Sequence, residues 1–219
     1  MSFLSCLRPS ESLTEAIAGL IMVLTFTLAA SVVTGGGQDG ARAAMLGAVG
    51  CNAAWGIIDA VLYLMNSVFD RNRRVRLARA IASAPDEAAG LATIRRELDP
   101  YLAPVTQVED RETFYRSIRN TLAGGPLPQR GGLVRDDFMG AVAVFCIALI
   151  AALPAVLPLF LLTNHPWLAL RVSNLLVVGL LFIVGYHWAK YVDANPWLAG
   201  LGLTALGLAM VAVAIPLGG

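Results

Sequence analysis

Long apolar runs separated by short polar segments dominate the sequence. Five runs approach or exceed the roughly 18 residues needed to cross a bilayer, and they cover residues 16–33, 43–69, 138–162, 167–190 and 197–217. Pro154 and Pro158 interrupt the third run, and we expect a kink near Pro154. The turn at residues 193–196 predicts that the last two runs form an antiparallel hairpin. The pattern therefore predicts an all-α membrane protein with five transmembrane helices.

The polar stretch between the second and third runs has its own helical pattern. Residues 73–83 are predicted to continue the second helix, and two short helices are predicted over 86–98 and 109–122, before a glycine-rich connector. We expect the stretch to be too short and too polar to bury a sizeable core, so that its helices lie against the membrane face or a partner. The predicted organisation is 1–69 (N-terminal tail and the first two membrane helices), 70–134 (cytoplasmic helical segment) and 135–219 (the last three membrane helices).

The composition supports a membrane protein, and the positions of the charged residues predict its orientation in the membrane. Hydrophobic residues make up 57% of the chain and charged residues 14%, against about a quarter charged in soluble domains. Twelve of the sixteen basic residues are arginines between Arg71 and Arg135. The positive-inside rule places residues 70–134 and the N-terminus in the cytoplasm and the C-terminus outside. A bacterial inner membrane is the expected location, because no organelle-targeting segment is apparent.

The same arginines bear on the choice of partner. They alternate with acidic residues and adjoin a membrane helix, so anionic lipid headgroups are expected to contact them and nucleic acid is not.

The N-terminal region favours a retained helix over a cleaved signal peptide. Ser12 and Glu15 have the spacing of a capping box, which predicts that a helix opens there. Cys6, Cys51 and Cys146 lack CxxC spacing, and we interpret them as small apolar residues, with neither a disulfide framework nor a zinc site expected.

A polar stripe marks the second apolar run. Asn52, Trp55, Asp59, Tyr63 and Asn66 recur at spacings of three and four, which places them along one helical face. One interpretation is a cation or proton pathway, with Asp59 as charged ligand or proton carrier and Asn52 as an oxygen ligand. The other is that Asn52 and Asp59 hydrogen-bond to neighbouring helices and fix their packing.

Other ionisable groups lie near the ends of the apolar runs. Arg171 and Asn174 are near the outer end of the fourth run, too far in depth from Asp59 for a direct pair, so Arg171 is expected to extend outward or to meet Asn52. Lys190 is at the inner end of that run, where Asp136 and Asp137 are the better-placed acids. We interpret these groups as structural or gating charges.

Weaker candidates lie in the first run and in the polar stretch. Met22, Thr25 and Thr27 either line a passage or simply pack. Glu109 and Glu112 have a spacing compatible with metal binding, which is also common at helix N-termini. His165 and His187 are isolated, on opposite sides of the predicted membrane. With no nucleophile elbow, phosphate-binding loop or HExxH motif, the sequence predicts neither an enzyme nor a permanently bound cofactor.

Two segments carry a family resemblance. Residues 15–27 (EAIAGLIMVLTFT) and 47–59 (GAVGCNAAWGIID), with Gly140, residues 154–158 and residues 181–186 (LFIVGY), resemble the vacuolar iron transporter family. The resemblance covers most of the membrane part and is moderately specific, because much of it is Gly, Ala and Leu. It implies a homodimer of five-helix subunits that exports Fe²⁺ or Mn²⁺ from the cytoplasm in exchange for protons, along a path between the first two helices.

The chain also departs from that family at its expected metal ligands. Ile21-Met22-Val23 stands where the family has Asn-Asp-Gly, Gly56-Ile57 stands where it has Gly-Glu, and an arginine-rich segment replaces the family's glutamate-rich helices. Either Asp59 substitutes for a lost carboxylate or metal transport has been lost. The leading hypothesis is a divalent-cation transporter that uses Asp59, Asn52, Met22, Thr25 and Tyr63. The alternative is a non-transporting membrane scaffold that recruits a partner or lipid.

Overall fold

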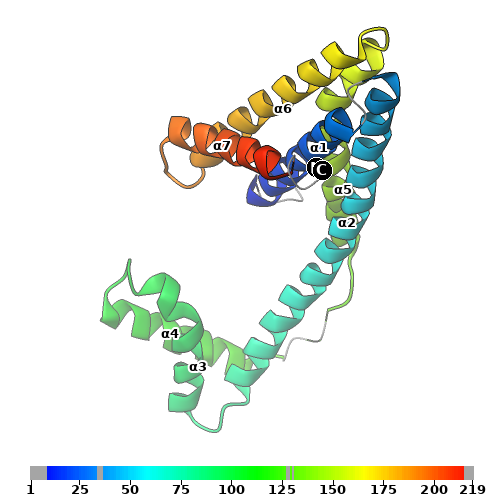
Figure 1. The fold of residues 1–219 in the computed structure, drawn as a ribbon. Coiled ribbons are helices and arrows are strands. Elements are labelled where there is room, and N and C mark those ends of the chain that lie inside the picture. Colours follow the sequence, from blue (N-terminus) through cyan, green and yellow to red (C-terminus); the bar gives the residue numbers. More distant parts are fainter. Residues whose placement is uncertain (1–8, 34–36, 127–128, 130, 215–219) are drawn as a thin grey trace. The chain divides into compact units, whose positions relative to one another are not determined.

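The computed structural model describes residues 9–33, 37–126, 129 and 131–214. Within them the chain is all-helical, as predicted (Figure 1). The elements are α1 (Pro9–Val33), α2 (Gln38–Ala82), α3 (Glu87–Leu102), α4 (Val108–Gly124), α5 (Arg135–Leu161), α6 (Pro166–Ala189) and α7 (Pro196–Ala214).

The helices form two compact units. The first, called here the bundle unit, comprises residues 1–64 and 135–219, and the second, the arginine-rich unit, comprises residues 65–134. Helix α2 is continuous and contributes to both, as predicted for its extension beyond residue 69. The arginine-rich unit therefore begins slightly earlier than the predicted boundary at residue 70.

Four of the described helices have the length and composition of membrane spans, namely α1, α2, α5 and α6. The apolar stretch of α7, Pro196–Met210, is shorter. The predicted end of the fifth run, at residue 217, lies outside the described residues.

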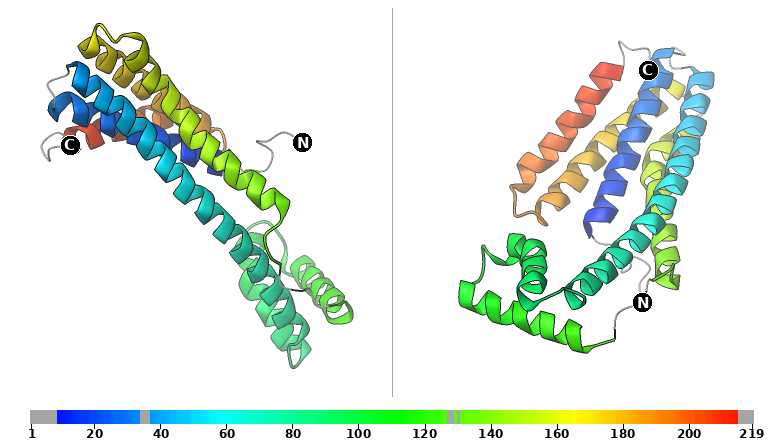
Figure 2. Two further views of the ribbon diagram at one scale, coloured as in Figure 1. Left: turned by 90° about the vertical axis from the view of Figure 1, so that its right-hand side faces the viewer. Right: turned by 90° about the horizontal axis from the view of Figure 1, so that it is seen from below.

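Helix α1 lies at the centre of the bundle unit. It packs against α5, α6 and α7, and α6 packs in turn against α5 and α7 (Figure 2). Phe26 of α1 meets α2 at Gly47, where an added Cβ would lie 2.9 Å from the Phe26 ring. The core is built from small and aliphatic side chains of four helices: Leu20, Val23, Leu24, Ala48, Ala152, Ala155, Val177 and Leu181.

Helices α6 and α7 form the predicted antiparallel hairpin (Figure 1). Asn195 caps α7, since its Oδ1 accepts hydrogen bonds from the amides of Trp197 and Leu198 at 3.0 and 3.3 Å. The helices approach closely at Gly185, where a Cβ would lie 2.8 Å from the Ala199 carbonyl oxygen. The backbones of α6 and α7 can therefore approach this closely only because Gly185 has no side chain.

The start of α1 differs from the prediction. The described helix already includes Pro9, so Ser12 and Glu15 lie inside it and not at its first residues. Cys51 and Cys146 are free and partly buried, whereas Cys6 lies outside the described residues.

Helix α5 continues through both of its prolines. Pro158 is buried with Ala155 against the rest of the bundle. The kink near Pro154 stays a prediction.

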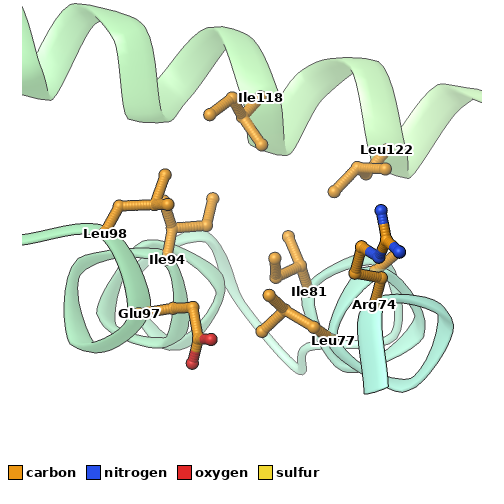
Figure 3. Close-up of a pocket in the computed structure, with 9 residues that line it drawn as sticks. Arg74, Leu77, Ile81, Ile94, Glu97, Leu98, Ile118 and Leu122 are labelled. Atoms are coloured by element: carbon orange, nitrogen blue, oxygen red, sulfur yellow. The ribbon is translucent and has the colours of Figure 1, made fainter. Parts of the chain in front are cut away.

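The arginine-rich unit has a small core. Ile81, Leu91, Ile94 and Tyr115 are buried where α2, α3 and α4 meet. Ile118 and Leu122 extend from α4 toward Ile94 and Ile81 across a cavity of about 150 Å³ (Figure 3). The apolar positions of α3 and α4 follow helical periodicity, so each short helix buries one stripe.

The hairpin contact generates a stability prediction. Gly185→Ala forces a methyl group against the α7 backbone and should destabilise the bundle by about 1–3 kcal/mol. The apparent Tm in detergent should fall by about 2–4 °C per kcal/mol. Gly179→Ala, on the same helix, is the matched control, because a Cβ there meets nothing within 4 Å. Equal effects of the two substitutions would contradict the proposed close contact.

Candidate functional site

Asn52 occupies a buried junction of α1, α2 and α5. Its side chain is 0% exposed, and its Nδ2 donates to the Ala48 carbonyl oxygen at 2.9 Å. A Cβ on Gly19 of α1 would lie 3.1 Å from Asn52 Oδ1 and 3.0 Å from Ala151 Cβ of α5. In the described structure, Oδ1 has no hydrogen-bond partner. A buried acceptor therefore faces the α1 backbone at a point where the adjacent residue has no side chain.

Asp59 lies two helical turns after Asn52 on α2. Its Oδ2 is likewise buried, and no described group donates a hydrogen bond to it. Gly56, between the two, packs closely on α5, where a Cβ would lie 3.0 Å from the Phe145 ring and 3.2 Å from Ala148 Cβ. Asn52 and Asp59 thus belong to one face of α2, directed at α5 and α1. We call this face the polar seam.

Tyr63 continues the polar seam toward the start of α5. Its ring and hydroxyl occupy the space that a side chain on Gly140 would need, and the ring packs on Ala143 and Val144. Asp137, one turn before Gly140, is 6% exposed, so a second carboxyl group is buried on this part of α5. Trp55 and Asn66 of the predicted stripe are exposed.

The predicted residues of α1 differ in their surroundings. Met22, partly buried, lies one turn after Gly19 and so on a similar face of α1. Thr25 donates to the Ile21 carbonyl of its own helix at 2.9 Å. Thr27 is fully buried, and its Oγ1 lies 2.6 Å from Asn174 Oδ1 of α6. Asn174 therefore ties α6 to α1.

The predicted structural charges lie at helix ends. The Arg171 guanidinium lies over the Trp167 ring, 4.8 Å from its centroid, and Lys190 Nζ lies 5.2 Å from the centroid of Tyr186. Asp136 is exposed in the first turn of α5. Arg171 is thus directed toward its own helix start.

In the arginine-rich unit, Glu112 forms an ion pair. Arg95 Nε and Nη2 donate to the two carboxylate oxygens of Glu112 at 2.7 and 2.6 Å. These hydrogen bonds from Arg95 lower the pKa of Glu112 below its ordinary value. Glu109 is exposed and does not share this pair. Both oxygens of Glu112 are therefore engaged by a cation of the protein.

The described residues include no cluster of three or more His, Cys, Asp and Glu side chains that could hold a metal ion. Asn52 and Asp59 are separated by about 10 Å of helix rise, whereas hard-cation ligands lie 2.0–2.6 Å from the ion. One ion cannot contact both residues in this arrangement. The polar seam therefore offers successive weak positions, without a complete coordination shell.

No protein-family model matches the chain, and no curated protein matches it.

The sequence pattern did not indicate which glycines pack along the polar seam. Gly19, Gly56 and Gly140 each stand opposite a larger side chain on a neighbouring helix. A glycine inside an apolar helix is the available signal, but the chain has 21 glycines, and the pattern does not identify which ones face a polar group. The Thr27–Asn174 contact was missed for the same reason, since it joins residues far apart in the sequence.

The Arg95–Glu112 pair predicts a pH dependence. Because the folded pKa of Glu112 is lowered, its contribution to stability is present above the unfolded pKa, near 4.5, and is lost as pH falls through the folded value. Hydrogen exchange of α3 and α4 peptides should be faster in Glu112→Gln than in the native chain at pH 7. The difference should shrink at pH 3. A difference that is constant with pH would show that the pair does not stabilise this unit.

Proposed function

We propose that the chain is an integral membrane protein that carries a divalent cation, such as Fe²⁺ or Mn²⁺, along the polar seam. Four helices of spanning length and composition support the membrane location. We include α7 as a fifth span, since a hairpin partner of α6 with no charged residue fits the same environment. In this proposal residues 70–134 are cytoplasmic, because they contain most of the arginines.

The ends of α6 support this placement. Exposed Trp167 and Trp188 are separated by about 31 Å of helix rise, close to the roughly 30 Å thickness of a hydrocarbon core. A cation lies over an aromatic ring at each end, Arg171 on Trp167 and Lys190 on Tyr186. Aromatic and basic side chains of this kind favour the two membrane interfaces.

The observation that carries the transport proposal is the pair of unpartnered oxygens on α2. Asn52 Oδ1 and Asp59 Oδ2 are buried acceptors without a described donor. Leaving such a group unsatisfied costs about 1–3 kcal/mol, and more for a charged group. A passing cation satisfies both oxygens in turn, and a proton can satisfy Asp59. The resemblance of residues 15–27 and 47–59 to the vacuolar iron transporter family supports the same cargo and coupling to protons.

The residues act in sequence along the path. Asp59 supplies the negative charge, and Asn52 supplies a neutral carbonyl oxygen about two turns further along. Their separation favours transfer between positions over tight retention of one ion. Met22 and Thr25 contribute from α1, and Tyr63 lies one turn beyond Asp59 toward the cytoplasmic end of the seam.

A scaffold is the second candidate, and tight packing favours it. Gly19, Gly56 and Gly140 bring helices into contact along the polar seam, and Thr27 with Asn174 joins α1 to α6. In that case Asn52 and Asp59 only fix helix positions, and the arginine-rich unit recruits a partner or anionic lipid.

A second copy of the chain is part of the transport proposal. In the bundle unit, α2 exposes an apolar face that includes Ile57, Ile58, Val61 and Leu62. This face contacts lipid or, in the homodimer that we propose, the partner subunit.

The test is Fe²⁺ and Mn²⁺ flux into proteoliposomes with an imposed pH gradient. The native chain should transport at least one of the metals, and Asp59→Asn should reduce flux at least about tenfold, the effect of losing roughly 1.4 kcal/mol of transition-state stabilisation. Asp193→Asn is the control, because Asp193 is in the α6–α7 turn at φ 52° and Asn also tolerates that conformation.

Each outcome separates the candidates. No flux of either metal through well-folded native protein would leave the scaffold as the better account. Flux that survives Asp59→Asn would exclude this carboxylate from the path.

A further inference from the structure

A pocket of about 370 Å³ lies in the bundle unit where α2 begins and α5 ends. Ala41 and Met45 of α2 and Leu159 and Phe160 of α5 form its apolar wall, and Gln38, Arg42 and Thr163 add polar groups. Its volume is in the range of small-ligand sites. The wall is continuous with a second core cluster, in which Ala169 and Leu170 of α6 pack on Ala41 and Leu159. The pocket is therefore lined by α2, α5 and Thr163, and its wall rests on the packed start of α6.

Arg42 gives this apolar pocket an unbalanced positive charge. The side chain is exposed, and within the described residues no hydrogen bond, ion pair or ring contact engages its guanidinium. Asp39 lies one turn earlier on α2 without pairing with it. The first turns of α2 add the positive end of a helix dipole. A negatively charged group beside the pocket would interact favourably with both the Arg42 guanidinium and the start of α2.

The combination of an apolar wall and one guanidinium selects among anions. A free phosphate ion could contact Arg42, Gln38 and Thr163, but it would leave the apolar wall of Met45, Leu159 and Phe160 uncovered. A phospholipid, by contrast, can place an acyl chain against the apolar wall and its phosphate at the rim, beside Arg42. Phe160 is 67% exposed, so the chain would cover apolar surface that is otherwise uncovered. Arg171 and Trp167 at the start of α6 mark the interfacial depth at which headgroups lie.

We propose that this pocket binds an anionic phospholipid, with an acyl chain against Met45, Leu159 and Phe160 and the phosphate on Arg42. The inference rests on the membrane location proposed above and is independent of cation transport. In the proposed orientation the lipid belongs to the outer leaflet.

Native mass spectrometry of the full chain in detergent tests the proposal. The probes are phosphatidylglycerol and phosphatidylcholine with identical acyl chains. The native chain should retain phosphatidylglycerol in preference, and Arg42→Gln should weaken its binding about tenfold, as expected for one lost charge-assisted hydrogen bond. Arg42→Lys should keep most of the binding. Arg171→Gln is the matched control, since it removes an exposed guanidinium that rests on Trp167 outside the pocket.

A second variant tests the apolar part. Thr163→Trp places a large side chain at the exposed rim and should reduce retention of both lipids. Circular dichroism and size-exclusion profiles confirm that each variant is folded.

Three results would overturn the proposal. These are unchanged phosphatidylglycerol binding in folded Arg42→Gln, an equal loss in Arg171→Gln, and displacement of the lipid by millimolar inorganic phosphate, which would indicate a site for a free anion. Loss of metal flux in the proteoliposome assay bears on none of them.

Discussion

Close contact between helix backbones, made possible by glycine, is the constraint on which the bundle unit depends. At Gly185 and Gly200 the α6–α7 hairpin has no room for a larger side chain. Around α2, a Cβ on Gly19, Gly56 or Gly140 would likewise lie very close to a neighbouring helix. Apolar helices in a lipid environment gain little from hydrophobic burial against one another, so packing at short range has to hold them together. The positions of the glycines therefore decide which faces meet.

The same contacts place polar atoms where water is excluded. Asn52 Oδ1 faces Gly19, and Asp59 Oδ2 is buried one turn beyond Gly56. A well-packed bundle would be more stable with apolar groups there, because replacing an unsatisfied polar group by an apolar one of similar shape is neutral or stabilising. Thr27 and Asn174 show the contrasting case, in which two polar groups from different helices lie within hydrogen-bonding distance. The unpartnered pair on α2 is for this reason the better candidate for function.

Periodicity predicted the elements, and contacts between distant residues decided the rest. Apolar runs predicted α1, α2 and α5 to α7. The helix predicted over 86–98 begins where α3 begins, and Asp86 caps it by accepting a hydrogen bond from the Ala89 amide. The small core of the arginine-rich unit depends on a contact that residue spacing does not show, because Tyr115 is buried where α3 and α4 pack together and its hydroxyl reaches Asp99. In the candidate site, spacing identified the inward face of Asn52, Asp59 and Tyr63. It could not distinguish the contact glycines from the many others, or assign Glu112 to Arg95.

The central claim is that the polar seam binds a divalent cation, and Mn²⁺-dependent thermal unfolding tests it most directly. At ten times its Kd, for example about 10 mM Mn²⁺ on a weak site with a Kd of about 1 mM, a ligand stabilises the native state by about 1.4 kcal/mol, which corresponds to roughly 3–6 °C in Tm for a chain of this size. The native chain should show this increase with Mn²⁺. Asp59→Leu should show none while unfolding at a similar or higher temperature without metal. An equal increase in both chains, or none in the native chain at millimolar Mn²⁺, would contradict the account.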